Sequence, residues 1–417
     1  MAWHKRISWR NALLILAVIG PGIITANVDN DAGGIATYSI VGAHFGYRLL
    51  WLFVPIAVTL IIVQEMAARL GVVSGKGFAD LIRENFGIKV TFYLMATLLA
   101  VNLANTMAEF AGWAASMEIF GVARYIAVPV AALLVWLLVV RGRYRFVERI
   151  FLFASAVYIT YIVSGLLAKP DWGKALHQTL VPSVSMGNAY LVATVALIGT
   201  TIAPWMQFYL QSAVVEKGVK TDQYPATKID VIVGCIMANV VAVFIVVACA
   251  ATLFKNGIMV ESAKDAALAL KPLAGKYAAL LFAIGLANAS LFAASILPLS
   301  TAYSVCEGMG WEGGVNTTFK EAPQFNWIYT GLIVLGAGIV LIPGAPLLMI
   351  LYWSQVLNGV LLPVTIAVAL ILVNKPEIMG DKVNSKGYNF VAWAAAAATG
   401  IASIMMVLTM VAPGLFN

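Results

Sequence analysis

Apolar runs long enough to cross a lipid bilayer recur along almost the whole chain, and they constrain its fold more than any other feature. A transmembrane helix needs about 20 apolar residues, because the hydrocarbon core of a bilayer is about 30 Å thick. We count eleven such runs in the 417 residues. Only 11% of the residues are charged, against roughly 25% in soluble domains. The sequence therefore predicts a polytopic, all-α membrane protein with one transmembrane domain over residues 1–417.

The arrangement of these spans suggests two halves that are inverted in the membrane. The predicted spans are 11–45, 49–72, 91–115, 124–140, 149–167, 188–215, 229–254, 278–306, 326–343, 346–373 and 389–412. Five spans per half would invert the second half, and transporters built in this way have broken helices at matching positions. We expect repeats at about 11–170 and 186–373, broken first and sixth helices, and an extra helix at 389–412.

Basic residues predict the orientation of the chain. Most Lys and Arg residues fall on one side of the membrane, which the positive-inside rule makes the cytoplasmic side. The densest run, RGRYRFVER at 141–149, is better explained as a topology determinant than as a ligand site, and no continuous basic patch indicates nucleic acid. We expect a monomer in the plasma membrane, with a cytoplasmic N-terminus and the C-terminus outside.

The first span contains a break with two carboxylates. Its stretch GPGIITANVDNDAGGIATYS places Asp29, Asp31 and the pair Gly33 and Gly34 at membrane depth. An ionisable residue at that depth indicates a functional site, and irregular backbone is tolerated there only where it faces protein or a water-filled cavity. We interpret the stretch as an unwound cation site; the alternative is that the two aspartates only cap a bent helix.

The sixth span contains a second break, at Ala203, Pro204 and Trp205. A proline deep in a helix removes one hydrogen bond and clashes with the preceding turn, so we expect the two breaks to face each other near the midplane. The side-chain oxygens available at the breaks belong to Asn27, Asp29, Asn30, Asp31, Thr200, Thr201 and Gln207. Hard oxygen ligands suit Mg²⁺, Ca²⁺ or Mn²⁺.

Several motifs resemble the Nramp-type divalent metal transporters. The family signature Asp-Pro-Gly-Asn falls on Asp31 to Gly34, and the resemblance continues through QEMAARLGVVSGKGFADLIRENFG, ANTMAEFAG, LFAIGLANAS, SQVLNGVLLP and PEIMG. It implies a LeuT-like fold of inverted five-helix repeats. It also implies that Asp31 is the central metal ligand, with carbonyls at Val28 and Thr200 and the side chain of Gln355 as further candidates.

The departures from the family pattern bear on which ion is carried. Gly34 stands where the family has a metal-binding Asn, and Ala203, Pro204 and Trp205 stand where it has Met-Pro-His. The second family histidine aligns near Leu210 or Gln211, between which the sequence does not decide. Without the thioether that favours transition metals, the chain resembles the Nramp-related magnesium transporters, which implies an ion carried with much of its hydration shell.

A further departure concerns the third helix of the family, where an Asp and a Glu resemble a proton path. The Asp of that path is Thr106 here, and only Glu109 remains; the basic residues expected in the ninth helix are missing, since no Lys or Arg lies between Lys320 and Lys375. We therefore predict uncoupled transport. Glu109 has an alternative interpretation as a structural carboxylate.

These observations lead to a main hypothesis and two alternatives. The main one is an importer of hydrated divalent cations, chiefly Mg²⁺ and also Mn²⁺, that works by alternating access. The second is a proton-coupled Mn²⁺/Fe²⁺ importer. The third is a permease for an organic solute, although the two acidic residues at the break disfavour binding of an anionic solute there. We find no nucleophile, base and orienting group that would indicate an enzyme, and expect no cofactor besides the transported ion.

Overall fold

The computed structural model describes residues 22, 25, 28–140, 155–314 and 317–411. Every regular element in this part of the chain is a helix, as the sequence predicts. Most of the first half of the first span, the basic run at 141–149 and the start of the fifth span lie outside the described residues.

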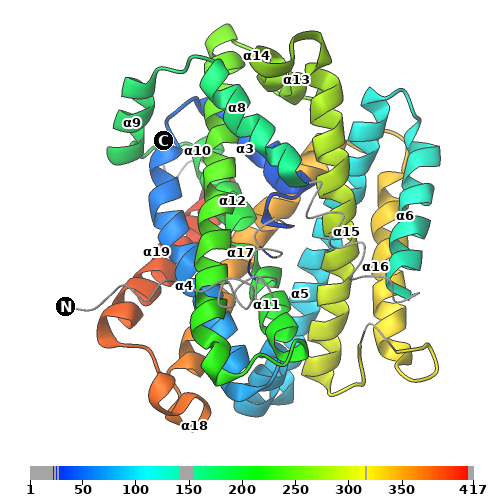
Figure 1. The fold of residues 1–417 in the computed structure, drawn as a ribbon, viewed down its shortest axis with the longest axis vertical. Helices are drawn as coiled ribbons and strands as arrows, with labels where there is room; N and C mark the ends of the chain where they lie inside the picture. Colours follow the sequence, from blue (N-terminus) through cyan, green and yellow to red (C-terminus); the bar gives the residue numbers. More distant parts are fainter. Residues whose placement is uncertain (1–21, 23–24, 26–27, 141–154, 315–316, 412–417) are drawn as a thin grey trace, which may run out of the picture.

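Helices occupy the positions of the predicted spans (Figure 1). They are α3 (Ala32–Phe45), α4 (Phe53–Ser74), α5 (Phe78–Ile119), α6 (Arg124–Val140), α8 (Ile159–Leu167), α10 (Asn188–Thr201), α11 (Pro204–Glu216), α12 (Tyr224–Thr252), α15 (Ala278–Met309), α16 (Pro323–Val340), α17 (Leu347–Val373) and α19 (Lys386–Val411). Seven helical segments in the described ranges are long and apolar enough to cross a membrane. Helix α5 begins before its predicted span because it continues through a kink at Gly87, where φ is 78°.

Short helices that the sequence analysis did not predict lie in the connections. They are α9 (Trp172–Leu180), α13 (Ala263–Ala267), α14 (Lys271–Ala274) and α18 (Pro376–Met379). Figure 1 shows α9, α13 and α14 at one end of the bundle and α18 at the other. We call these the α9 end and the α18 end.

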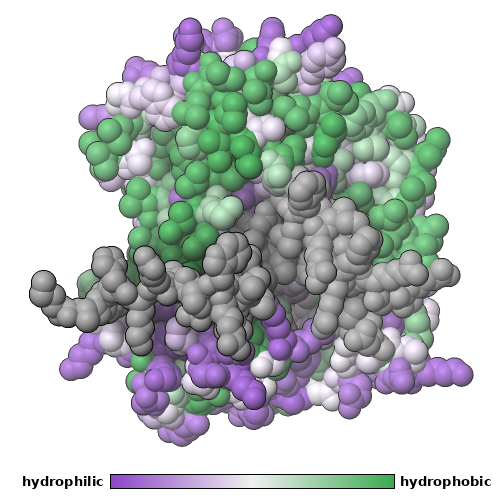
Figure 2. Space-filling view, in the orientation of Figure 1, coloured by the Kyte–Doolittle hydropathy of each residue, from purple (hydrophilic) through white to green (hydrophobic). Residues whose placement is uncertain are grey.

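The outer surface of the bundle is apolar between its two ends. In Figure 2, hydrophobic side chains cover much of the visible flank, whereas hydrophilic ones gather at both ends. Large apolar side chains are exposed on helices far apart in the sequence, for example Ile126 (64% exposed) on α6, Val334 (62%) on α16 and Ile404 (62%) on α19. A water-soluble protein does not leave so much apolar surface exposed, and lipid is the solvent that fits it.

The first break follows from an aspartate that ends one helix and begins the next. Asp29 is helical, Asn30 forms a turn, and Asp31 has extended backbone with φ −69° and ψ −179°. Asp31 is the N-cap of α3, and its side chain accepts a hydrogen bond from the amide of Gly34. Asp is among the best N-cap residues because its carboxylate satisfies an amide that has no partner within the helix.

The second break follows from Pro204. Helix α10 ends at Thr201, Ala203 is extended with φ −66° and ψ 137°, and Pro204 occupies the first position of α11. A residue before proline is forced towards extended backbone, whereas proline itself suits the first turn of a helix. The dipeptide Ala203-Pro204 therefore both stops α10 and starts α11.

Both broken helices lie in the protein interior. Almost every residue of α3 and α10, and α11 from Pro204 to Gln211, is buried. Helix α3 packs against α10, α12 and α17, while α5 packs along α15 and α17. The broken segments are thus surrounded by helices on all these sides, as a site shielded from lipid requires.

Candidate cation site

Oxygen atoms from both breaks converge at Gly34. A Cβ atom placed on Gly34 would lie 3.0 Å from the Asp29 carbonyl oxygen, 3.2 Å from Thr200 Oγ1 and 3.3 Å from Asp31 Oδ1. Asp29 and Asp31 belong to the first break, whereas Thr200 lies in the last turn of α10. A side chain at position 34 would therefore press against three oxygens, which the glycine leaves uncovered.

Several oxygens near the breaks have no hydrogen-bond donor among the described residues. They are Asp29 Oδ1 and Oδ2, Asn30 Oδ1, Thr200 Oγ1 and Gln207 Oε1, all in buried residues. A buried polar atom without a partner costs about 1–3 kcal/mol, and a native structure retains such atoms where a ligand or water satisfies them. Acceptor oxygens in this number favour a cation.

Asp31 has a double engagement at this point. Its Oδ1 accepts from the Gly34 amide at 2.6 Å, and its carboxylate interacts electrostatically with those of Asp29 and Glu109. The helix cap that the sequence offered as an alternative interpretation is therefore present. It does not exclude a cation role, since the cap uses one oxygen of a carboxylate that has two.

Glu109 reaches the first break from α5. Its side chain is fully buried, with Oε2 3.4 Å from the Ala32 amide and Oε1 without a donor in the described part of the chain. Gly112, one turn further along, lets α5 approach closely, because a Cβ there would lie 2.4 Å from Ala32 Cβ. Thr106 is different: its hydroxyl donates to the Asn102 carbonyl of its own helix.

Gln355 of α17 also lies beside the first break, but its oxygen is engaged. Its Nε2 is 1.9 Å from the position of a Cβ on Gly33, while its Oε1 accepts from Asn358 Nδ2 at 2.8 Å. The amide therefore presents its NH₂ group to the broken helix. It would have to turn over to offer an oxygen to a cation.

Two other predicted site residues are placed at the breaks without side-chain ligand atoms. Val28 is buried in the last turn before the first break. Ala203 is buried between α10 and α11, and its carbonyl accepts from the Met206 amide at 3.1 Å and from Gln207 Nε2 at 3.3 Å. In the described ranges no group of three or more His, Cys, Asp or Glu side chains could hold a metal ion, so backbone, hydroxyl and amide oxygens would have to complete a site.

A buried amide network next to the site was not predicted. Asn105 of α5 and Asn358 of α17 donate to each other, at 2.8 Å and 3.0 Å. Asn102 donates to Thr301 of α15 at 2.9 Å, so the network joins three helices and ends at Gln355. The signal in the sequence was the spacing of Asn102 and Asn105, three residues apart in an apolar run.

Tyr38 is a second residue that the sequence analysis missed. Its hydroxyl lies 3.0 Å from Thr201 Oγ1, which itself donates to the Leu197 carbonyl. This contact joins α3, about two turns past the first break, to the last residue of α10 at the second break. It fixes the two halves of the candidate site to each other.

Comparisons with known proteins agree with this architecture. The family model described as natural resistance-associated macrophage protein-like (Nramp) matches residues 22–409. A protein named divalent metal cation transporter MntH from Yersinia pestis is 29% identical over 382 residues, covering 89% of this chain and 90% of the relative. One of the same name from Erwinia tasmaniensis is 29% identical over 388 residues, covering 90% of each chain.

Solved structures give the same fold. The Eremococcus coleocola manganese transporter, in complex with an aromatic bis-isothiourea substituted compound, superposes with a TM-score of 0.75 at 21% identity, covering 99% of this chain and 90% of the other. Mhp1, a nucleobase-cation-symport-1 family transporter, superposes with a TM-score of 0.58 at 13% identity, covering 94% and 93%. These likenesses confirm the predicted LeuT-like fold. Because the family model matches nearly the whole described chain, the protein belongs to the Nramp family.

Proposed function

We propose that the protein imports divalent cations, chiefly Mg²⁺ and also Mn²⁺, by alternating access around the two breaks. The observation that carries this proposal is the convergence of Asp29, Asp31 and Thr200 oxygens at Gly34. The names of the MntH relatives support a divalent metal as the substrate. The acidic pair and the unpartnered oxygens near the breaks favour a hard cation.

The space at Gly34 favours an ion that keeps water. A side chain at position 34 would crowd the Asp29 carbonyl, Thr200 Oγ1 and Asp31 Oδ1 at 3.0–3.3 Å, so glycine keeps these three oxygens open to a hydrated ligand. Mg²⁺ loses its waters reluctantly and is usually bound through one or two carboxylates with several waters retained. The absence of a thioether at Ala203 removes the soft ligand that would favour a transition metal.

An Asp31→Asn variant tests the site most directly. Asn caps helices about as well as Asp, so α3 should form normally while the negative charge is lost. We expect Mg²⁺ uptake into proteoliposomes to fall by at least about a hundredfold, since a charged ligand contributes about 3 kcal/mol or more at a buried site. Asp171→Asn is the matched control, because Asp171 caps α9 at the surface by accepting from the Lys174 amide. Mg²⁺ uptake by this variant should equal that of the wild type. Unchanged uptake by Asp31→Asn would sink the proposal.

The second candidate is a proton-coupled Mn²⁺/Fe²⁺ importer, which the position of Glu109 beside Ala32 favours. A side-by-side assay of Mg²⁺, Mn²⁺ and Ca²⁺ uptake with a proton-sensitive dye separates the two. Uncoupled Mg²⁺ transport leaves the vesicle pH constant. Acidification that accompanies Mn²⁺ uptake and disappears in Glu109→Gln would establish the second candidate instead.

We also propose the orientation that the basic residues indicate, with the N-terminus and the α18 end in the cytoplasm and the α9 end outside. The α18 end would then release the ion. Two single variants with a cysteine at an exposed position test this, Lys174→Cys at the α9 end and Lys382→Cys at the α18 end. The first should react with an impermeant thiol reagent from outside the cell, and the second from inside. The opposite pattern would reverse the orientation.

A further inference from the structure

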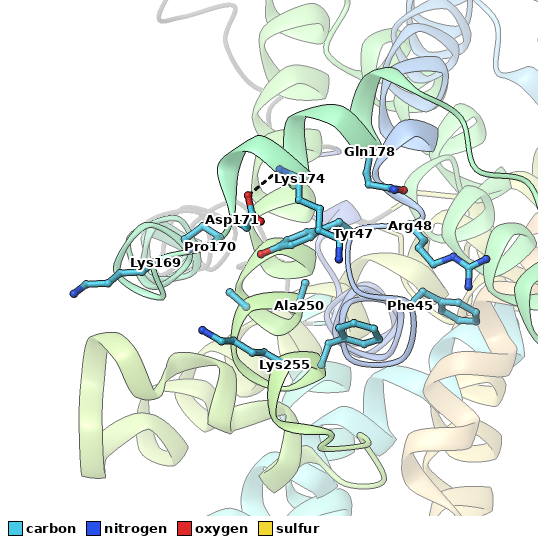
Figure 3. Close-up of a pocket in the computed structure, with 12 residues that line it drawn as sticks. Phe45, Tyr47, Arg48, Lys169, Pro170, Asp171, Lys174, Gln178, Ala250 and Lys255 are labelled. Atoms are coloured by element: carbon cyan, nitrogen blue, oxygen red, sulfur yellow. Dashed lines mark hydrogen bonds between the residues drawn. The ribbon is translucent and has the colours of Figure 1, made fainter.

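A pocket of about 460 Å³ opens at the α9 end, well away from the breaks. It is lined by the end of α3 and the connection after it, the connection before α9, helix α9 itself, the end of α12 and the turn after α12 (Figure 3). None of the residues of the candidate cation site lines this pocket. Its position is set by α3, whose first turn lies at the first break and whose last residue, Phe45, lines the pocket.

The pocket has a strongly positive wall. Arg48, Lys169, Lys174 and Lys255 line it, with Asp171 as the one carboxylate among its lining residues. Figure 3 places Lys169 and Arg48 towards opposite ends and Lys174 and Lys255 between them. None of these four cations forms an ion pair within the described residues. A cluster of basic groups that repel one another favours an anionic ligand.

The floor of the pocket is apolar. Phe45, Ala250, Ala251 and Phe254 line it, and the Phe254 ring packs against Gly46, where a Cβ would lie 3.0 Å from the ring. A small inorganic anion would gain little from such a surface. An amphiphile with an anionic group and an apolar part uses both walls.

Helix α9 places the pocket at the level of the lipid headgroups. One of its faces contributes Asp171, Lys174 and Gln178 to the pocket. The other face exposes Trp172 (48%), Leu176 (61%) and Leu180 (69%), a stripe with the four-residue spacing of a helix face. A short helix with one polar and one apolar face, the apolar face carrying Trp, is typical of the membrane interface.

The backbone conformation at Lys169 also indicates that the pocket is preformed. Lys169 has φ of 50°, and it is the one non-glycine residue in the described chain with a positive φ. Such a conformation is unfavourable and persists where surrounding structure holds it, often at ligand-binding positions. Buried Pro170 and the N-cap Asp171 follow it directly, so this connection is fixed between α8 and α9.

We propose that this pocket binds the phosphate headgroup of an anionic phospholipid from the leaflet at the α9 end. Lys174 and Lys255 contact the phosphate, and the apolar part of the lipid lies against the floor at Phe45 and Phe254. The ligand would bridge α9 and α12 at the end of α3. This binding does not depend on which ion the protein carries.

The test uses the full-length protein in mixed micelles, with lipids retained on the protein counted by native mass spectrometry. Phosphatidylglycerol is titrated against phosphatidylcholine. We expect the wild type to retain phosphatidylglycerol about tenfold better, and Lys174→Gln/Lys255→Gln to lose that preference, since interfacial basic residues attract anionic lipid additively. Both lysines are exposed, so the substitutions should not disturb folding. Ala251→Trp, which fills the pocket and keeps its charges, should lose the same lipid.

The matched control is Lys264→Gln/Lys271→Gln, which removes two exposed charges from the same connection, between α12 and α15, but outside the pocket. It should bind phosphatidylglycerol as the wild type does. Equal losses in both double variants would reduce the effect to general surface charge and overturn the proposal. Displacement of the lipid by inorganic phosphate at no more than the lipid's own concentration would overturn it too, because the site would then prefer a free anion.

Discussion

Because residue 34 is glycine, no side chain covers the oxygens of the candidate cation site at this position. Three oxygens lie within 3.3 Å of the place where a Cβ would be. The sequence located this position because an acid, a turn and a glycine pair in an apolar run are local signals. It could not show that Thr200, from another helix, would lie opposite, since that depends on how the two breaks pack.

Gly34→Ala should therefore impair transport without unfolding the protein. The added methyl group crowds the three oxygens, and overpacking of this kind typically costs about 1–3 kcal/mol, which corresponds to about a fivefold to 150-fold effect. We expect Mg²⁺ uptake to fall by at least about fivefold. Gly338→Ala on α16 is the control, because its Cβ would meet nothing within 4 Å. Equal uptake by the two variants would show that the space at Gly34 is not used.

At the scale of the elements, a glycine seam and the amide network hold the broken helices in place. A Cβ on Gly199 of α10 would lie 2.2 Å from the Gln355 carbonyl oxygen and 2.3 Å from the Gly359 amide of α17, so the two helices touch through their backbones, as small residues allow in membranes. Both breaks were predictable from Asp, Gly and Pro. The pairing of Asn105 with Asn358 was not, because those residues lie 253 positions apart and nothing local specifies a partner.

The reciprocal amide pair leads to a prediction for stability. Asn358→Leu leaves the buried oxygens Asn105 Oδ1 and Gln355 Oε1 without the donor that Asn358 Nδ2 provides, at a cost of about 1–3 kcal/mol each. We expect a clear fall in the thermal unfolding temperature in detergent. The double variant Asn105→Leu/Asn358→Leu should recover part of that loss, since removing both partners is less costly than removing one. Additive losses in this double-mutant cycle would mean that the pair is not coupled.

At the scale of the whole molecule, a buried ion pair at the α18 end joins parts of the chain that the two breaks do not. Arg69 of α4 contacts Glu65 through Nε at 3.0 Å and Nη2 at 3.1 Å. The same carboxylate accepts from Tyr388 of α19 at 2.6 Å and from Tyr224 of α12. The cluster therefore fixes α4, α12 and α19 to one another where the ion would leave.

Arg69→Met should destabilise the protein strongly. It leaves the buried Glu65 carboxylate without its cation, which costs about 3–5 kcal/mol. The exposed pair of Lys76 and Glu84, at 2.6 Å, provides the control, because surface pairs contribute about 0–1 kcal/mol. We expect Arg69→Met to unfold at a much lower temperature than the wild type, and Lys76→Met to unfold at the wild-type temperature. Similar unfolding temperatures for the two variants would contradict this account.

Energy coupling is also a property of the whole molecule. If transport is uncoupled, the membrane potential drives it, and two elementary charges are worth about 4.6 kcal/mol per 100 mV. We expect Mg²⁺ uptake to rise when a potassium diffusion potential makes the vesicle interior negative, with no change in internal pH. Glu109→Gln should keep this dependence. A pH gradient that drives Mg²⁺ uptake at zero potential would refute uncoupled transport.

The cap of α3 has a consequence for the choice between divalent ions. Asp31 Oδ1 already accepts a hydrogen bond from the Gly34 amide at 2.6 Å, so a cation that used both oxygens of this carboxylate would have to share Oδ1 with the start of the helix. Ca²⁺ takes six to eight ligands and often grips a carboxylate through both oxygens, whereas Mg²⁺ is satisfied by single contacts in an octahedron. The same hydrogen bond that begins the helix should therefore reduce the coordination number available to a large ion and disfavour Ca²⁺.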